Sequence, residues 1–468
     1  MRSARKGGPA AAVIAFLAAA SAATAAEYAF VTTTDYTAGS SSVVWLDGSY
    51  TVETGVEPVF SDATARWYQG LIYVVNRLGA DNVQVIDPSA GFSTVAQNSV
   101  GNGTNPKDIA FVTRRKAFVS RSDTNELLIF DPMSGEILGT VDLSAFADSD
   151  GLCEMDCLYL KGEYLFVSVQ RVDRDNWWSP VGDSYIAVVD AAADSLVDVD
   201  PFTPGVQGIP LAGANPFTEL KYDHHLDRLL VSCVGYWGVE DGGIEIVDPF
   251  EMESEGFMIT EAAAGGDICE FEIFSPRKGY MIVATPSFVT DLVVFDPSAG
   301  TAGATLYSPG AWVLNDIEIS PFGEIFVADQ TETAPGLWIW DAGPDTLIFG
   351  SPRSTGLPPF DITFSVPFTS EAGDPPAAAA LGRPYPNPFN PATRIPFSIA
   401  VDGRVEISVF DVRGARVRTL TDGFLGAGAH ETAWDGLNEA GTAVPSGVYF
   451  VRMISSGGTS TGKIVLVR

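Results

Sequence analysis

The chain has 468 residues, more than one hydrophobic core usually holds, so its length predicts about two to four domains or a repeat architecture. Its 59 acidic residues outnumber the 27 basic ones and give a formal net charge of −32, which argues against a nucleic-acid-binding protein. The hydrophobic fraction of 46% excludes disorder of the whole chain, and 47 Gly and 30 Pro residues favour strands and turns over long helices.

The first 26 residues have the pattern of a signal peptide. Arg2, Arg5 and Lys6 precede an apolar run at residues 10–20, and small residues at 23–25 form a cleavage site. The apolar run is shorter than the ~20 residues that a membrane-spanning helix needs, so we predict no transmembrane segment. The sequence therefore predicts export through the periplasm and a secreted or cell-surface location.

An apolar segment that ends in Asp, often in Asp-Pro, recurs along the middle of the chain. The seven copies end at Asp47, Asp87, Asp131, Asp190, Asp248, Asp296 and Asp341. A second apolar segment precedes each copy, and a third precedes most of them. Four short strands in a repeat of about 40–50 residues are typical of a β-propeller, in which neighbouring sheets bury each other's apolar faces. The predicted fold class is therefore all-β.

The two ends of the repeat region complement each other. The first repeat begins at its second strand, whereas residues 358–366 follow the seventh repeat and have the pattern of an additional innermost strand. We therefore predict a seven-bladed β-propeller over residues 27–369 that a C-terminal strand closes, which leaves no exposed sheet edge. Residues 105–111 and 129–144 resemble the YVTN-type propeller repeat of exported and surface-layer proteins. This resemblance implies the architecture but no particular activity.

A linker composition at residues 370–382 precedes a predicted small Ig-like β-sandwich at residues 383–468. Its predicted core residues are Trp434, Phe410, Val448 and Phe450. Five motifs occur here: YPNPFNP at 385–391, DVRG at 411–414, WDG at 434–436, GVYF at 447–450 and KIVLVR at 463–468. They resemble the type A C-terminal sorting domain of type IX secretion, which shares its Ig-like form with the flagellar hook-capping protein. The resemblance implies contact with the outer-membrane secretion machinery and surface attachment. The alternative is an accessory Ig-like module without a sorting role.

Acidic residues stand near the start of six predicted innermost strands: Asp108, Asp156, Glu219, Glu270, Asp316 and Asp361. Because innermost strands surround the channel of a propeller, we expect these carboxylates to form a ring at one mouth, where they would bind a metal ion or have raised pKa values. Ca²⁺ is the predicted cofactor because it takes several oxygen ligands. The alternative is that each carboxylate only accepts backbone N–H groups or faces channel water.

The longest predicted loops carry large aromatic residues beside acidic ones. Residues 171–183 and 235–243 connect the second and third strands of the fourth and fifth repeats. The predicted ligand-binding residues are Trp177, Trp178, Tyr236, Trp237, Asp173, Asp175, Glu240 and Asp241. Rings beside carboxylates can stack on a sugar or hold a cationic group. The alternative is that the rings only pack locally on the sheets.

Evidence for an enzyme is thin. The chain has three His and no GxSxG, HExxH or P-loop motif. We expect the turn at His224 and His225 to lie on the face opposite the carboxylate ring, which leaves no His in the channel. Four cysteines could oxidise after export, and their spacing leaves all three pairings open.

We favour an exported, surface-delivered binding or scaffold protein whose acidic loop face recognises a cation, a glycan or a protein. One alternative is a metal-dependent propeller hydrolase or lyase that uses the channel carboxylates. Another is a purely structural component of a surface layer.

Overall fold

The structure of the chain is a computed structural model that describes residues 27–365, apart from 177, and most of residues 380–467. The predicted signal peptide, residues 1–26, lies outside the described residues, as do residues 366–379 of the predicted linker and short gaps in the C-terminal part. No helix among the described residues is long and apolar enough to cross a membrane.

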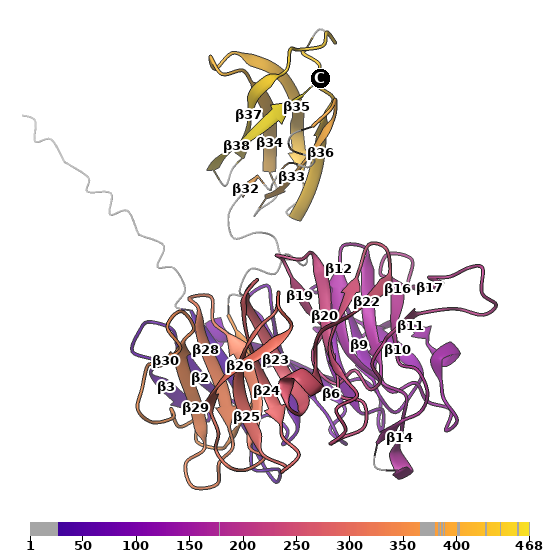
Figure 1. Cartoon of the computed structure of the whole chain (residues 1–468), viewed down its shortest axis with the longest axis vertical. Coiled ribbons are helices and arrows are strands. Elements are labelled where there is room, and N and C mark those ends of the chain that lie inside the picture. The colour runs from indigo at the N-terminus through magenta and orange to yellow at the C-terminus, as the bar shows by residue number, and fades with distance from the viewer. Residues whose placement is uncertain are drawn as a thin grey trace, which may run out of the picture.

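Seven sheets of four or five strands lie within residues 28–364 of the described chain (Figure 1). The first contains β1 (Tyr28–Thr34), β2 (Gly39–Trp45), β3 (Val52–Thr54) and β31 (Pro359–Phe364). The second contains β4 (Ala63–Tyr68), β5 (Leu71–Asn76), β6 (Asn82–Asp87) and β7 (Ser93–Ser99). The third contains β8 (Pro106–Thr113), β9 (Lys116–Arg121), β10 (Glu126–Phe130) and β11 (Ile137–Asp142). The fourth contains β12 (Met155–Lys161), β13 (Tyr164–Val169), β16 (Tyr185–Asp190), β17 (Ser195–Val197) and β18 (Ile209–Pro210).

The fifth sheet contains β19 (Lys221–Asp223), β20 (Arg228–Cys233), β21 (Gly243–Asp248) and β22 (Glu253–Thr260). The sixth contains β23 (Asp267–Ser275), β24 (Lys278–Ala284), β25 (Thr290–Asp296) and β26 (Thr301–Tyr307). The seventh contains β27 (Leu314–Ile319), β28 (Glu324–Asp329), β29 (Gly336–Asp341) and β30 (Thr346–Leu347). Short elements lie in the loops: β14 (Val172–Asp173), β15 (Ser179–Pro180), α1 (Glu261–Ala264) and the 3-10 turns Pro88–Ala90, Ser144–Phe146 and Arg174–Asn176.

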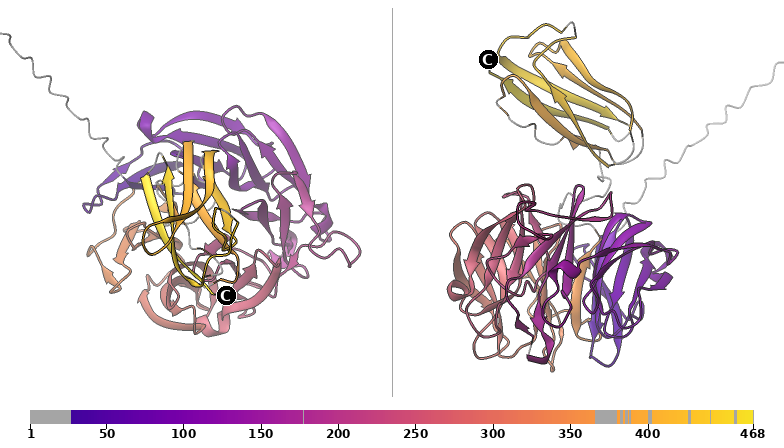
Figure 2. Two further views of the ribbon diagram at one scale, coloured as in Figure 1. Left: turned by 90° about the horizontal axis from the view of Figure 1, so that it is seen from above. Right: turned by 90° about the vertical axis from the view of Figure 1, so that its right-hand side faces the viewer.

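The sheets form a ring when the protein is seen from above (Figure 2). The last innermost strand closes it, because β31 pairs antiparallel with β1 and places Val31 opposite Ile362. The backbone N of Tyr28 also donates to Oγ of Ser365 at 2.9 Å. The prediction that the C-terminal strand of the repeat region completes the N-terminal sheet is therefore confirmed, and the architecture is an all-β propeller.

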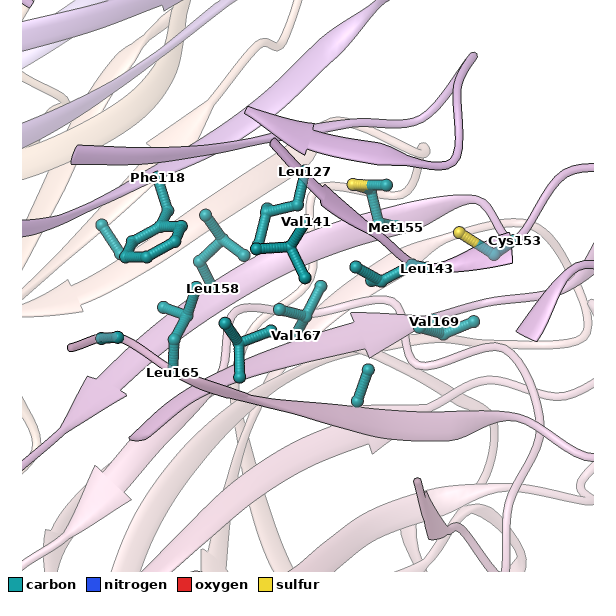
Figure 3. Packing of buried hydrophobic residues seen from close by; sticks show 14 of the residues in the cluster. Phe118, Leu127, Val141, Leu143, Cys153, Met155, Leu158, Leu165, Val167 and Val169 are labelled. Atoms are coloured by element: carbon teal, nitrogen blue, oxygen red, sulfur yellow. The ribbon is translucent and has the colours of Figure 1, made fainter. Parts of the chain in front are cut away.

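The hydrophobic core is divided among the spaces between neighbouring sheets. In one such space, Phe118 and Leu127 of the third sheet pack against Leu165 and Val167 of the fourth (Figure 3). Both faces of the middle strands are covered, so strands such as β5 are buried along their whole length. Each fully buried aliphatic or aromatic side chain stabilises the fold by about 1.5–3 kcal/mol, so the ring depends on sheet-to-sheet packing.

The recurring Asp has a structural role at the end of each third strand. In every copy, Oδ1 accepts a hydrogen bond from a backbone N two or three residues further on. At Asp131, for example, the bond comes from the N of Met133 at 2.9 Å. A short Asx turn of this kind reverses the chain toward the fourth strand. The Asp whose recurrence predicts the propeller fold is thus a turn-forming residue.

Two further sheets lie among the described C-terminal residues. One contains β32 (Ala380–Leu381), β33 (Thr393–Ile399) and β36 (Gly428–Trp434), and the other contains β34 (Gly403–Phe410), β35 (Arg416–Leu425), β37 (Gly447–Ser455) and β38 (Gly458–Leu466). Trp434 is fully buried, as predicted, among Val409, Tyr449 and Val451.

The prediction of the C-terminal core is wrong for three of its four residues. Phe450 is 37% exposed, and Phe410 and Val448 are only half-buried. Because successive strand residues face opposite sides, the neighbouring residues Val409, Tyr449 and Val451 supply the core instead.

Candidate functional site

The six predicted metal ligands lie on the innermost strands or beside them: Asp108 on β8, Asp156 on β12, Glu219 before β19, Glu270 on β23, Asp316 on β27 and Asp361 on β31. All six side chains are buried or half-buried. Buried carboxylates need partners, since an ionised group without them is costly away from water. The contacts of these six residues therefore decide what the channel can do.

Three of the carboxylates join neighbouring innermost strands. In each, Oδ2 accepts a hydrogen bond from a backbone N of the next innermost strand around the ring. The bonds run from the backbone N of Leu158 to Asp108 at 2.9 Å, from that of Ile362 to Asp316 at 2.7 Å and from that of Ala65 to Asp361 at 2.8 Å. These bonds connect β8 to β12, β27 to β31 and β31 to β4, so the carboxylates hold adjacent sheets together at the channel.

In Asp108, Asp316 and Glu270, one carboxylate oxygen accepts a hydrogen bond from the N of the following residue. The bonds run from Ile109 to Asp108 at 2.8 Å, from Ile317 to Asp316 at 2.8 Å and from Phe271 to Glu270 at 2.9 Å. The strand register shifts at each of these three positions. A β-bulge leaves a backbone N–H out of the ladder, and the carboxylate accepts it. These contacts fit the alternative interpretation, in which the acids satisfy backbone groups.

Arg66 on β4 contacts three of the six carboxylates. Its Nε lies 2.9 Å from Oδ1 of Asp108, its Nη2 2.7 Å from Oε1 of Glu219 and its Nη1 3.8 Å from Oδ1 of Asp361. Burial alone would lower the pKa of Arg66, but the three carboxylates, Asp108 foremost, raise it well above the usual value. Arg66 therefore stays charged. No repeated pattern in the sequence marks Arg66, so it is not among the predicted residues.

Lys221 on β19 is the centre of a second charged group. Its Nζ lies 3.4 Å from Oε1 of Glu270 and 3.2 Å from Oε1 of Glu318, and it also contacts Glu272. Asp156 lies apart from this group, 4.0 Å from Nζ of Lys107. Arg66 and Lys221 thus each have three carboxylates around them.

Burial changes the protonation of the channel acids. It raises the pKa of Glu272 and of Asp361 to about 8, and that of Glu270 to about 7. Burial also acts on Glu219, but the attraction of Arg66 and Lys221 outweighs it and lowers the pKa of Glu219 below its usual value. Near neutral pH the channel therefore holds ionised and protonated carboxyl groups side by side.

Within the described residues, no three His, Cys, Asp or Glu side chains are grouped so that they could hold a metal ion. The structure brings the predicted ligands to Arg66, Lys221 and backbone N–H groups. The predicted Ca²⁺ cofactor is not tested by these contacts and stays a prediction.

A cavity of about 430 Å³ occupies the channel. It is lined by charged groups, among them Arg66 and Lys221, and by His224 and His225. The expectation that no His reaches the channel is therefore wrong. The turn after β19 contains both His, and because β19 is an innermost strand, its end lies at the channel mouth.

The aromatic residues predicted on the long loops separate into two groups. Trp177 lies outside the described residues. Trp178 is 46% exposed and lies beneath the Arg174 guanidinium, 5.4 Å from the ring centre. Tyr236 is exposed and donates from its hydroxyl to the carbonyl of Pro180 at 3.4 Å, which links the two loops.

Trp237 belongs to a different group, which we call the aromatic cluster: Phe217, Trp237, Phe288 and Trp312. Phe217 and Trp237 meet edge to face with ring centres 5.0 Å apart. Trp237 and Trp312 are 5.7 Å apart, and Phe288 and Trp312 are 6.4 Å apart. Phe288 is 70% exposed, Trp312 45% and Phe217 41%, so the cluster is open to solvent. The sequence prediction found only Trp237.

Backbone contacts fix the loops that carry this cluster. A Cβ at Gly242 would lie 1.8 Å from the carbonyl O of Cys233, so the loop after Trp237 packs directly on its strand. Oγ1 of Thr290 accepts from the backbone N of Val313 at 3.1 Å, next to Trp312. Backbone packing and hydrogen bonds therefore hold the loops of Trp237 and Trp312 in place.

Carboxylates lie on the loop of Trp237 or bind its backbone. Oδ2 of Asp267 accepts from the backbone N of Gly238 at 2.8 Å, and Oδ1 of Asp241 accepts from the N of Tyr236 at 3.1 Å. Glu240 is exposed on the same loop. The predicted residues Asp173 and Asp175 lie on the loop of the fourth sheet, where Oδ1 of Asp173 accepts from the N of Asp175 at 3.0 Å. The structure thus places Glu240 and Asp241 on the loop of Trp237, and Asp173 and Asp175 on that of Trp178.

All four cysteines are free: Cys153, Cys157, Cys233 and Cys269. All four pack in hydrophobic clusters, Cys157 and Cys233 in the same one, and burial raises the pKa of every thiol. Protonated, buried thiols are poor nucleophiles, so they act here as small packing residues.

The comparisons with known proteins support the two kinds of β-domain. Residues 396–458 match the FlgD Ig-like domain. No curated protein matches the chain. Among solved structures, the chain is similar to a putative 6-phosphogluconolactonase from Bacteroides fragilis, with 11% identity over 74% of this chain and 99% of that one and a TM-score of 0.52.

Two further solved structures are similar. The periplasmic gluconolactonase PpgL of Pseudomonas aeruginosa has 14% identity over 72% of this chain and 98% of that one, with a TM-score of 0.50. The type IX secretion component PorZ of Porphyromonas gingivalis has 14% identity and a TM-score of 0.43. That match covers 92% of this chain, which spans 63% of the length of PorZ. At these identities the likeness to the two lactonase structures shows the propeller fold alone.

Replacing Asp108 tests the bonds between innermost strands. We expect Asp108→Asn to destabilise the propeller by about 3 kcal/mol, because one amide oxygen cannot accept from Leu158, Ile109 and Arg66 together. Calorimetric unfolding measures the change. The control is Glu332→Gln at an exposed loop position, which should change stability by less than about 0.5 kcal/mol. Equal stability of the two variants would contradict the structural role of Asp108.

The buried carboxyl of Glu261 predicts a pH dependence. Burial raises its pKa to about 8, with Asp267 and Asp241 adding to the effect. The folded state therefore holds a proton that the unfolded state releases above about pH 4.5, so stability falls as the pH rises from there to about pH 8. Between about pH 5.5 and pH 8.5, we expect the thermal midpoint of the wild type to fall by about 2 °C more than that of the Glu261→Gln variant. Parallel pH profiles for the two proteins would show that Glu261 is not responsible.

Proposed function

We propose that this protein is an exported, surface-delivered binding protein that uses the aromatic cluster to bind a saccharide. The observation that carries this proposal is the grouping of four aromatic rings from separate loops, three of them more than 40% exposed. Soluble proteins seldom leave large contiguous apolar surface uncovered, and such patches mark interaction sites.

The chemistry around the rings favours a saccharide. A sugar presents an apolar C–H face that stacks on an aromatic ring and a rim of hydroxyls that donate to carboxylates. Carboxylates of Glu240 and Asp241 stand on the loop of Trp237. The propeller region, residues 27–376, has a net charge of −37, which disfavours an anionic ligand such as a nucleic acid.

The channel acids give less support to a metal-dependent hydrolase or lyase. Asp108 and Asp361 each accept a backbone N–H from the next strand and also face Arg66. Carboxylates held in this way are occupied by structural partners. We therefore prefer a binding protein.

The proposed route to the cell surface rests on both ends of the chain. Residues 1–26 have the pattern of a signal peptide, and residues 383–468 resemble a type IX sorting domain. The match of residues 396–458 to the FlgD Ig-like domain supports the Ig-like form that this sorting domain has. The YVTN-type repeat is also found in exported proteins, which agrees with this route.

Removing single rings tests the proposed saccharide site. We expect Trp312→Ala and Phe288→Ala each to weaken saccharide binding about tenfold, because each removes an exposed stacking surface. A glycan array identifies the ligand, and calorimetry with that glycan measures the affinity. The matched control is Phe202→Ala, which removes a ring that is 96% exposed on the connection between β17 and β18. Binding that is lost equally in the control, or no glycan bound by the wild type, would contradict the proposal.

Deleting residues 383–468 tests the sorting role. In a bacterium with a type IX secretion system, we expect the full chain to reach the cell surface or the medium, whereas the shortened chain stays in the periplasm. Cell fractionation with immunoblotting measures the distribution, and a full chain with Trp312→Ala serves as the control for normal export. Equal surface delivery of the shortened chain would leave the Ig-like part without a sorting function.

A further inference from the structure

The channel cavity lies apart from the aromatic cluster and carries its own chemistry. Its volume of about 430 Å³ lies within the range of small-molecule sites in proteins. Its charged wall includes Arg66 and Lys221 with their carboxylate partners Asp108, Glu219, Glu272 and Glu318. The lining residues come from most of the innermost strands, so the pocket exists only in the closed ring.

Acidic side chains outnumber cationic ones in the channel. Arg66 has three carboxylate neighbours and Lys221 has three others, so six acids surround two cations. Both cations are already paired and have little attraction left for an anionic ligand. The excess of carboxyl groups over cations favours a cation instead, and the low-dielectric walls of the channel strengthen its attraction.

Asp223 adds a buried carboxylate at the end of β19. It lines the cavity, and its side chain is only 6% exposed. Its Oδ1 accepts from the backbone N of His225 at 2.6 Å, whereas its Oδ2 has no hydrogen-bond partner. A buried carboxylate oxygen without a partner is costly unless a ligand or water supplies a donor.

Aromatic side chains line the cavity beside these acids: Trp67, Tyr159, Tyr222 and Phe274. One of them already binds a cation, since Nζ of Lys161 lies 3.7 Å from the ring centre of Tyr222. Ring faces attract organic cations and also pack against the alkyl chain that carries the charge. An apolar and acidic wall of this kind suits an amine better than a hydrated metal ion.

We propose that the channel cavity is a binding site for a small organic cation, an alkyl amine or diamine, which enters beside the turn of His224 and His225. The ammonium group binds among Glu272, Glu318 and Asp223, and the alkyl chain lies against the aromatic wall. This site is separate from the aromatic cluster and does not depend on the saccharide function.

Three probes with the same four-carbon chain test the sign of the charge. They are 1,4-diaminobutane, 1,4-butanediol and succinate, added to the full chain at matched ionic strength. We expect only the diamine to raise the thermal midpoint, by about 2 °C or more at saturation, and to bind one per chain by calorimetry. Stabilisation by succinate or equally by butanediol would overturn the proposal. So would stabilisation by CaCl₂ alone without any effect of the diamine.

Variants locate the bound diamine. We expect Glu318→Gln and Asp223→Asn each to weaken diamine binding about tenfold, measured against each variant's own midpoint without ligand. Glu332→Gln, an exposed acid outside the cavity, is the matched control and should bind like the wild type. Trp312→Ala should also keep diamine binding, which separates this site from the saccharide site. Unchanged binding in both channel variants would show that the diamine binds elsewhere and would overturn the proposal.

Discussion

Hydrogen bonds from one innermost strand to a carboxylate on the next are the contacts on which the channel depends. Sheets of a propeller are covalently joined only through loops, and their innermost strands approach each other without a continuous backbone ladder. Asp108, Asp316 and Asp361 supply acceptors at these approaches. Each stands at or beside a shift of strand register, where a free N–H would otherwise be buried. The acidic channel is a consequence of this way of joining sheets.

Joining the sheets with carboxylates also brings several acidic groups close together, where their negative charges repel each other. Burial and mutual repulsion raise the pKa of Asp361 and Glu272 to about 8, and Arg66 and Lys221 each draw in three carboxylates. Two cations do not neutralise six acids, so some carboxyl groups remain protonated. If the proposed ammonium ligand enters, it meets carboxyl groups whose protons are held against mutual repulsion.

Repetition determined how much of this could be predicted from the sequence. The Asp that ends each third strand recurs, and the additional strand at residues 358–366 supplies the strand that the first repeat lacks. The closed ring could therefore be predicted from the pattern alone. The acids on the innermost strands recur as well. Arg66 and Lys221 occur once each, and no periodicity marks them. The aromatic cluster joins residues from positions 217 to 312, and only the folded loops bring them together. In the Ig-like part, Phe450 and Tyr449 are neighbouring aromatic residues, and the strand register decides which is buried.

The two proposed sites belong to different electrostatic environments, which makes their ligands separable. The aromatic cluster is open to solvent, where salt screens the field of the propeller and stacking depends on ring area. The channel has low-dielectric walls, so its charges are screened much less than those on the surface. A ligand for the surface is therefore selected by shape and hydroxyl pattern, whereas a ligand for the channel is selected by the sign of its charge. On these two proposals, one acidic propeller would bind a neutral saccharide outside and a cation within, without either ligand competing for the other's site.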